Sequence, residues 1–317
     1  MKAKNLLLHH GRQLGTLCGL LGLVITFWVL TPHFLTLSNL LNIAQQTCIN
    51  AVIAVGMTFV IIAAGIDLSV GSIVAFSGVV LARALQSGIP LFAAILIGLG
   101  VGLICGLVNG LLISFGKLPP FIATLGMMSV ARGAALLYTQ GRPVSGFSAS
   151  FRWLSTGEVA HVPAPVILMI LVYAVAHFVL KRSKLGRYTY AIGGNEEAAV
   201  LSGVNVTIYK TVIYGLCGMF SGLAAIILTA RLNSAQPIAG MMYELDAIAA
   251  TVIGGTSLMG GEGSVLGTLI GALIMGVLRN GLNILGVSSF VQQIVIGSVI
   301  VAAVLADMAL KRRGKSI

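Results

Sequence analysis

The chain alternates between long apolar stretches and short polar ones. Most of the apolar stretches have the length that a helix needs to cross a hydrocarbon core roughly 30 Å thick. The first stretch ends without the small-residue site of a cleaved signal peptide, so we expect it to be retained as a span. The pattern predicts ten spans, at residues 14–31, 48–65, 69–86, 90–115, 120–138, 163–180, 211–230, 244–258, 265–285 and 290–308.

Composition supports a membrane protein and leaves little room for anything else. Hydrophobic residues make up 57% of the 317 positions and charged residues 9%, against roughly 25% charged in an ordinary soluble domain. Ten spans of about 20 residues leave too few positions for a soluble domain of roughly 100 to 200 residues. We therefore expect an all-α polytopic membrane protein, with one transmembrane domain over residues 1–317 and its energy source on another chain.

The basic residues set the expected orientation. With the N-terminus inside, the inner segments hold 13 of the 19 Lys and Arg residues and the outer segments hold 4, as the positive-inside rule requires. The net charge of +11 is then explained by orientation in the lipid bilayer. The sequence lacks the aromatic-basic patch that would indicate nucleic-acid binding. This predicts a cytoplasmic N-terminal tail over 1–13, a cytoplasmic loop over 181–210 and a cytoplasmic C-terminal tail over 309–317.

Two polar, glycine-rich segments, 65–72 and 254–264, interrupt the apolar pattern. Broken helices are tolerated at membrane depth where they line a cavity or are covered by protein. The two segments have similar sequences, and an internal repeat and a chance similarity are equally good explanations. For Asp67 we favour a helix cap or hinge over direct substrate contact. The candidate residues for a translocation path or hinge are Asp67, Ser69, Gly71, Asn109, Gly255, Thr256 and Ser257.

Other polar residues within the predicted spans have mainly structural explanations. We expect Arg132 to pair with a carboxylate rather than with a substrate oxygen. Asn109, Asn280 and Asn283 are suited either to a hydroxylated substrate or to hydrogen bonds between helices. The glycines at 98, 102, 106 and 110 recur at every fourth position, which favours close helix packing inside one protomer over a dimer contact.

No catalytic or metal-binding pattern accompanies the spans. The five histidines form no pair at metal-ligand spacing, and neither GxSxG nor HExxH occurs. The four cysteines lie in or beside apolar stretches without a CxxC pair, so we expect them to be small core residues. We expect no enzyme activity, metal or cofactor on this chain.

The loop over 181–210 contains a predicted short helix. Asn195 is a suitable N-cap, Glu196 and Glu197 favour a first turn, and Gly203 can end the helix. A helix of about two turns is too short to be stable alone. It therefore needs a protein surface, which is either the chain's own bundle or a second subunit.

These residues resemble a known pattern. Glu197-Ala198-Ala199, followed after three residues by Gly203, is similar to the EAA signature of permease subunits in bacterial ABC importers. The sequence from Thr36 to Asp307 resembles the ribose-type sugar permeases of that group, although the segment 204–207 departs from the hydrophobic tail of other importer classes. The other segments that carry this resemblance are 65–72, 185–188, 191–196 and 243–250.

The resemblance implies a permease subunit of the bacterial inner membrane that translocates a monosaccharide. A periplasmic binding protein would deliver the sugar, a cytoplasmic ABC ATPase subunit would bind ATP, and the chain would pair with a second permease, either an identical copy or a close paralogue. The implied ATPase-coupling residues are Gly194, Asn195, Glu196, Glu197, Ala198, Ala199 and Gly203. The alternatives are a related permease for a nucleoside or an amino acid, and an ion-coupled secondary transporter, which the scarcity of carboxylates in the spans disfavours.

Overall fold

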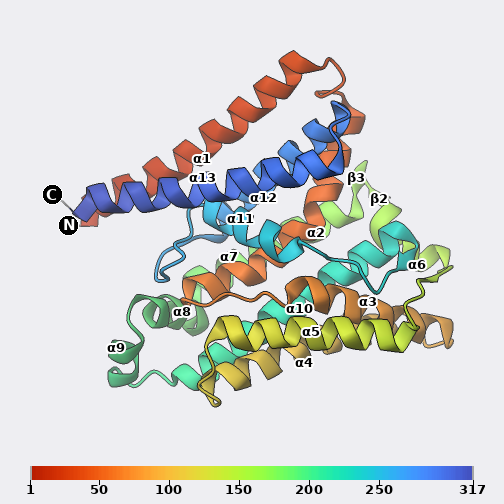
Figure 1. The fold of residues 1–317 in the computed structure, drawn as a ribbon, viewed down its shortest axis with the longest axis horizontal. Coiled ribbons are helices and arrows are strands. Elements are labelled where there is room, and N and C mark those ends of the chain that lie inside the picture. Colours follow the sequence, from red (N-terminus) through yellow and green to blue (C-terminus); the bar gives the residue numbers. More distant parts are fainter. Residues whose placement is uncertain (1, 316–317) are drawn as a thin grey trace.

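The computed structural model describes the backbone of residues 2–315 and the side chains of residues 14–302, 304 and 305. The predicted tails 1–13 and 309–317 therefore lie largely outside the described side chains. The described chain is mostly helical (Figure 1). Its helices are α1 (Lys2–Leu30), α2 (Leu37–Ile62), α3 (Val70–Gln86), α4 (Leu91–Ser114), α5 (Pro120–Thr139), α6 (Ala149–Thr156), α7 (Ala164–Arg182), α8 (Lys184–Gly194), α9 (Glu196–Leu201), α10 (Val206–Leu232), α11 (Tyr243–Ile253), α12 (Val265–Ile284) and α13 (Ser289–Lys315).

Two short antiparallel strand pairs lie between the helices. Strand β1 (Val144–Ser145) pairs with β4 (Ser234–Ala235), with Val144 opposite Ala235. Strand β2 (Glu158–Val159) pairs with β3 (Val162–Pro163) in the hairpin that follows α6. The first pair ties the loop after α5 to the segment after α10, which are far apart in sequence.

The predicted count of ten spans is not confirmed. Within the described residues, six helices are long and apolar enough to cross a membrane: α2, α4, α5, α7, α10 and α12. Three shorter apolar stretches lie in α1, α3 and α13. The span predicted over 244–258 is wrong as an uninterrupted helix, because α11 has 11 residues and is about 16 Å long, roughly half a hydrocarbon core. The expected all-α polytopic architecture agrees with the six long apolar helices.

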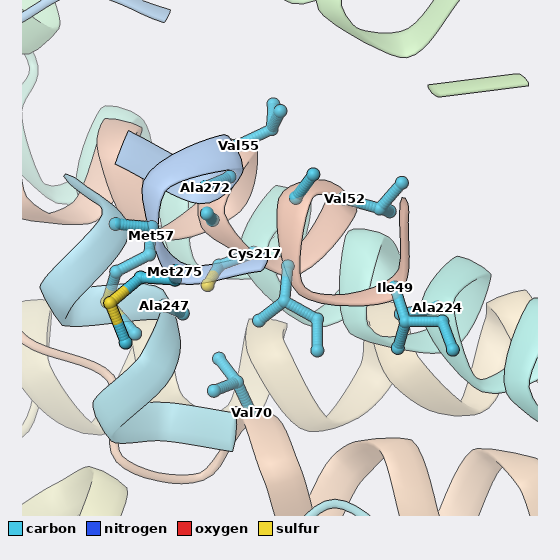
Figure 2. Close-up of a cluster of buried hydrophobic side chains, with 14 of the residues drawn as sticks. Ile49, Val52, Val55, Met57, Val70, Cys217, Ala224, Ala247, Ala272 and Met275 are labelled. Carbon is cyan, nitrogen blue, oxygen red and sulfur yellow. The ribbon is translucent and has the colours of Figure 1, made fainter. Parts of the chain in front are cut away.

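Helix α2 runs through the middle of the bundle. Every residue from Ala51 to Ile62 is buried, as expected for a helix that is apolar on all sides. Figure 2 shows Val52 and Met57 of α2 beside Cys217 of α10, Ala247 of α11 and Met275 of α12. Helices α10, α11 and α12 therefore share one core with α2.

Helices α4 and α10 pack backbone to backbone. A Cβ atom added at Gly102 would collide with the Gly218 carbonyl oxygen, and one at Gly106 with the carbonyl oxygen of Tyr214. Small residues at every fourth position allow this close approach. The glycine spacing predicted from sequence thus packs helices of one protomer together.

Helices α3 and α11 begin in the interior of the bundle. Their starts meet where Gly71, in the first turn of α3, lies against Gly240, three residues before α11. Non-helical segments made largely of turns, residues 63–69 and 233–242, lead into the two helices. We call these segments the early break and the late break. The late break differs from the predicted second interruption at 254–264, which lies between α11 and α12.

The loop predicted over 181–210 folds as two helices, α8 and α9. In Figure 1 they lie on the left, the side on which the first turn of α1 and the last turn of α13 also lie. The ends of the described chain and the predicted coupling loop therefore share one side of the bundle.

Candidate functional site

The early break is held by one carboxylate. Asp67 Oδ1 accepts a hydrogen bond from the backbone N–H of Ser69 at 2.9 Å and another from its hydroxyl at 2.5 Å. The predicted capping role needs correction, because α3 begins at Val70 with Ser69 as its N-cap and without a side-chain cap bond. Asp67 lies two residues before that cap, where its side chain closes a turn of the Asx type.

Asn109 of α4 extends this arrangement. Its Nδ2 donates to the Ser69 hydroxyl at 2.8 Å, and all three side chains are completely buried. Three buried atoms beside this bond have no hydrogen-bond partner: Asp67 Oδ2, Asn109 Oδ1 and the hydroxyl of Tyr214, which lies against Gly65. We call these side chains the Asp67 cluster. Because its members are inaccessible, the cluster does not line an open passage in this conformation.

The late break is held by an arginine of a different helix. Arg132 of α5 donates from Nη1 to the carbonyl oxygens of Pro237 at 2.8 Å and Ala239 at 2.7 Å. The hydrogen bonds of Arg132 thus go to backbone carbonyls and not to a carboxylate as predicted, although the Glu244 carboxylate is near enough to attract its charge. Non-helical backbone inside a bundle leaves carbonyls without helical partners, and a guanidinium can satisfy two of them.

Glu244 lies where the two breaks meet. It is in the first turn of α11, and its carboxylate contacts the position that a Cβ would occupy on Gly71. Glu244 and Arg132 are both half-buried. A charged side chain that remains partly accessible at this depth indicates a water-filled path or a partner, so these two residues are better placed than Asp67 to face a passage.

Behind this junction, an ion pair between the buried Asp246 and the partly exposed Arg279 joins α11 to α12. Arg279 Nη2 lies 2.7 Å from Asp246 Oδ2, which also accepts a bond from Asn50 Nδ2 of α2 at 3.0 Å. Asp246 is 2% exposed, and a buried charge requires such partners. This carboxylate therefore connects three helices and is not exposed to a passage.

The other asparagines join helices, one of the two possibilities left open by the sequence. Asn280 and Asn39 exchange side-chain hydrogen bonds at 3.0 Å between α12 and α2. Asn283 Oδ1 accepts from Gln292 at 2.8 Å between α12 and α13. Such bonds are a common way of joining apolar helices.

The segment 254–264 forms a tight glycine-rich turn between α11 and α12. Gly255 has a φ of +90°, which only glycine adopts easily. The Ser257 hydroxyl accepts from the backbone of Met259 at 3.1 Å, and Thr256 is 1% exposed. These residues shape the turn and, like Asp67, are covered in this conformation.

Helix α9 has the predicted cap and end. Asn195 Oδ1 accepts from the Ala198 N–H at 2.9 Å, Glu196 pairs with Lys210 at 2.6 Å, and Gly203 has a φ of +80°. Asn195 is also the residue that ends α8. The two helices are therefore joined through a single residue.

The two sides of α9 have different neighbours. Ala199 is 4% exposed and packs with Ile192 and Val206 of the same chain. The expectation that Ala199 forms a face toward a partner is corrected, since that side chain points into its own loop. Leu201 is 89% exposed and Val200 is 55% exposed, so the apolar face available to another protein is formed by these two residues.

The structure thus separates the predicted path or hinge residues into three places. Asp67, Ser69 and Asn109 form the buried cluster, Gly71 lies at the junction of the breaks, and residues 255–257 lie in the turn after α11. The late break was missed by sequence reasoning, although Pro237 and Gly240 in an otherwise apolar region are a signal for interrupted helix.

The chain is similar to known transport permeases, which agrees with its long apolar helices. A family model described as "Branched-chain amino acid transport system / permease component" matches residues 39–304. The chain is 52% identical over 298 residues to the ribose import permease protein RbsC of Bacillus subtilis, covering 93% of this chain and 92% of that protein. It is 50% identical over 296 residues to RbsC of Escherichia coli K12, covering 92% of each.

A relative named for another sugar is also similar. The D-allose transport system permease protein AlsC of Escherichia coli K12 is 41% identical over 300 residues, covering 94% of this chain and 92% of that protein. All three alignments extend across the breaks, α8 and α9.

Proposed function

The chain belongs to this family of transport-system permease components, and we propose that it is the membrane subunit of an ATP-driven importer for ribose or a closely similar monosaccharide. The observation that carries the proposal is identity of 50% or more, over more than nine-tenths of both chains, with permeases named for ribose import. The lower identity of 41% with the allose permease favours ribose over that sugar.

We place the translocation path beside the junction of the breaks. Arg132 and Glu244 are half-buried there, and the non-helical backbone of the late break offers N–H and carbonyl groups. A neutral, hydroxyl-rich sugar is suited to such a surface because it can exchange hydrogen bonds with both charged and backbone groups. The Asp67 cluster lies behind this surface and fixes the start of α3.

The partners follow from the same proposal. A cytoplasmic ATPase subunit binds and hydrolyses ATP and docks on the exposed apolar face of α9, formed by Val200 and Leu201. A periplasmic binding protein presents the sugar on the opposite side, and a second permease copy covers part of the exposed apolar surface. The chain itself needs no metal or cofactor in this scheme.

Orientation is testable independently of transport. If α8 and α9 are cytoplasmic, both termini are cytoplasmic too, and the chain crosses the inner membrane ten times when α3 and α11 are counted with their breaks. Reporter fusions after Gly88, Lys117, Thr156 and Ser183 should then report outside, inside, outside and inside. A different result at two or more positions would contradict this topology.

Uptake tests the substrate. The chain is expressed with its ATPase and binding protein in cells that lack their own ribose permease, and labelled ribose uptake is measured with allose, fructose or a nucleoside as competitor. We expect ribose uptake that stops on ATP depletion and continues with an uncoupler. Uptake with the opposite sensitivity would indicate an ion-coupled transporter, and selective inhibition by the nucleoside would indicate the other solute class.

A further inference from the structure

The end of α8 is inserted between two segments that are distant in sequence. A Cβ atom on Gly193 would collide with the Ile62 carbonyl oxygen at the end of α2 and would lie 2.7 Å from the Gly261 nitrogen. Gly261 in turn donates its N–H to that Ile62 oxygen at 2.9 Å. The α8 backbone is therefore in direct contact with the beginning of the early break and with the turn 254–264.

A second contact joins the same elements. The hydroxyl of Tyr190, one turn before Gly193 on α8, donates to the carbonyl oxygen of Gly263 at 2.7 Å. Burial raises the pKa of Tyr190 to about 12, so its hydroxyl remains a donor at neutral pH. Gly260, with a φ of +81°, is packed on the Gly193 carbonyl and on Ala64. Three segments thus meet within a few residues of the α9 cap.

This contact is stiff. Backbone atoms packed against backbone atoms contain no side-chain rotamers that could absorb a displacement, and close-packed interiors transmit strain. Because Asn195 both ends α8 and caps α9, a movement of α9 reaches Gly193 through two peptide units. The same movement then reaches the early break at Ile62 and the start of α12 through Gly261 and Gly263.

We propose that Tyr190 and Gly193 are the residues through which the docking helix α9 moves the end of α2 and the turn 254–264 together, with the early break carried along as a rigid unit. The inference rests on the proposed function and deepens it, since it names the positions that convert ATPase movement into opening of the path. Both are positioning residues and contact no substrate. Tyr190 fixes α8 to the turn before α12, and Gly193 permits the close approach to α2.

Other residues of the chain provide matched controls. Gly126 lies in the interior of α5, and a Cβ there would meet nothing within 4 Å. Gly193→Ala and Gly126→Ala both replace a helical glycine with a better helix former, and only the first introduces a collision. Tyr190→Phe removes one hydroxyl, and Tyr188→Phe removes a hydroxyl from a ring packed edge-on against Tyr209 with centroids 4.6 Å apart.

The experiment uses the assembled permease and ATPase in proteoliposomes. For each variant we measure co-purification of the ATPase, thermal stability, ATP hydrolysis stimulated by the sugar-loaded binding protein, and ribose transported per ATP hydrolysed. We expect Gly193→Ala to keep ATPase association and to lose about tenfold or more in transport per ATP. Tyr190→Phe should lose about threefold, with both controls within about twofold of the wild type.

Two results would overturn the inference. One is transport per ATP in both Tyr190→Phe and Gly193→Ala equal to that of the controls. The other is loss of ATPase association or thermal stability in proportion to the loss of transport, which indicates a merely structural contact. If the wild type transports no ribose but binding-protein stimulation of ATP hydrolysis is lost selectively in these two variants, the sugar assignment fails and the coupling inference stands.

Discussion

The early break and the late break are both non-helical segments inside the bundle, and hydrogen bonds of opposite kinds stabilise them. In the early break, a carboxylate of the segment itself accepts hydrogen bonds from Ser69. In the late break, the guanidinium of Arg132 donates to two backbone carbonyls from a different helix. The early break is therefore stabilised mainly from within, whereas the late break depends on the position of α5.

The two breaks also differ in how far their side chains are exposed. Asp67 and Ser69 are completely buried, whereas Ile238 is 55% exposed and Met241 is 65% exposed. A segment with few buried contacts and an external hydrogen-bond donor can move at lower cost. We infer that the early break is a rigid turn that keeps its shape when the helices move, and that the late break is the part of the path that changes shape.

The largest effect is expected when the donor to the late break is removed. Arg132→Ala eliminates two charge-assisted hydrogen bonds, each worth about 1.5 to 3 kcal/mol, so we expect uptake to fall to background at equal membrane abundance. Lysine supplies one donor group and should restore part of it. Ser129→Ala is the control, because Ser129 is exposed on the same helix and bonds only to Leu125 of that helix.

A smaller effect is expected at the early break. Asp67→Ala removes the acceptor for Ser69 and should destabilise the turn by about 2 kcal/mol. Asp67→Asn keeps one acceptor oxygen, and we expect it to retain much more uptake than Asp67→Ala when membrane abundance is matched. Equal loss in both variants, with normal assembly, would show that charge matters at Asp67 and would weaken the description of this break as a rigid turn.

The comparison can be extended to the docking helix. Leu201→Glu places a charge on the exposed face of α9 and should weaken ATPase association by about 1.5 kcal/mol or more with little change in thermal stability. Ala199→Trp should do the reverse, because that site is buried against Ile192 and Val206. Co-purification and a melting curve on one preparation test both. Normal ATPase association in Leu201→Glu would contradict docking at this face.

The smallest difference is expected in the unmodified protein. Backbone amides of residues 63–69 should exchange hydrogen about tenfold more slowly than those of 236–242, because local opening is easier where fewer contacts are buried. Hydrogen exchange measured by mass spectrometry in a lipid nanodisc compares the two peptides directly. Equal protection would remove the distinction between a rigid break and one that changes shape.

Local signals predicted the elements that depend on local physics. The six long helices follow from apolar length, and the cap at Asn195 and the end at Gly203 follow from residues within one turn of each end. The capping interpretation of Asp67 came close, since its oxygen does bind a backbone N–H, but the helix start could not be located to within two residues from sequence.

Tertiary contacts determined the rest. The apolar pattern over 244–258 is the same whether the helix crosses the membrane completely or halfway. The short α11 was therefore not predictable from periodicity. Arg132 has backbone carbonyls as partners, and backbone carries no sequence signal. Ala199 faces inward because of Val206, which lies beyond the turn that follows α9.

The glycine seam between α4 and α10 has a consequence for how this protein can change over time. Any side chain gained at Gly102, Gly106 or Gly218 collides with backbone on the opposite helix, and there is no larger residue there to shrink in exchange. A second mutation in the seam therefore cannot compensate for such a side chain. New substrate preferences must arise in other parts of the protein. The half-exposed late break, whose side chains can vary without displacing another backbone, is where we expect that variation to be found.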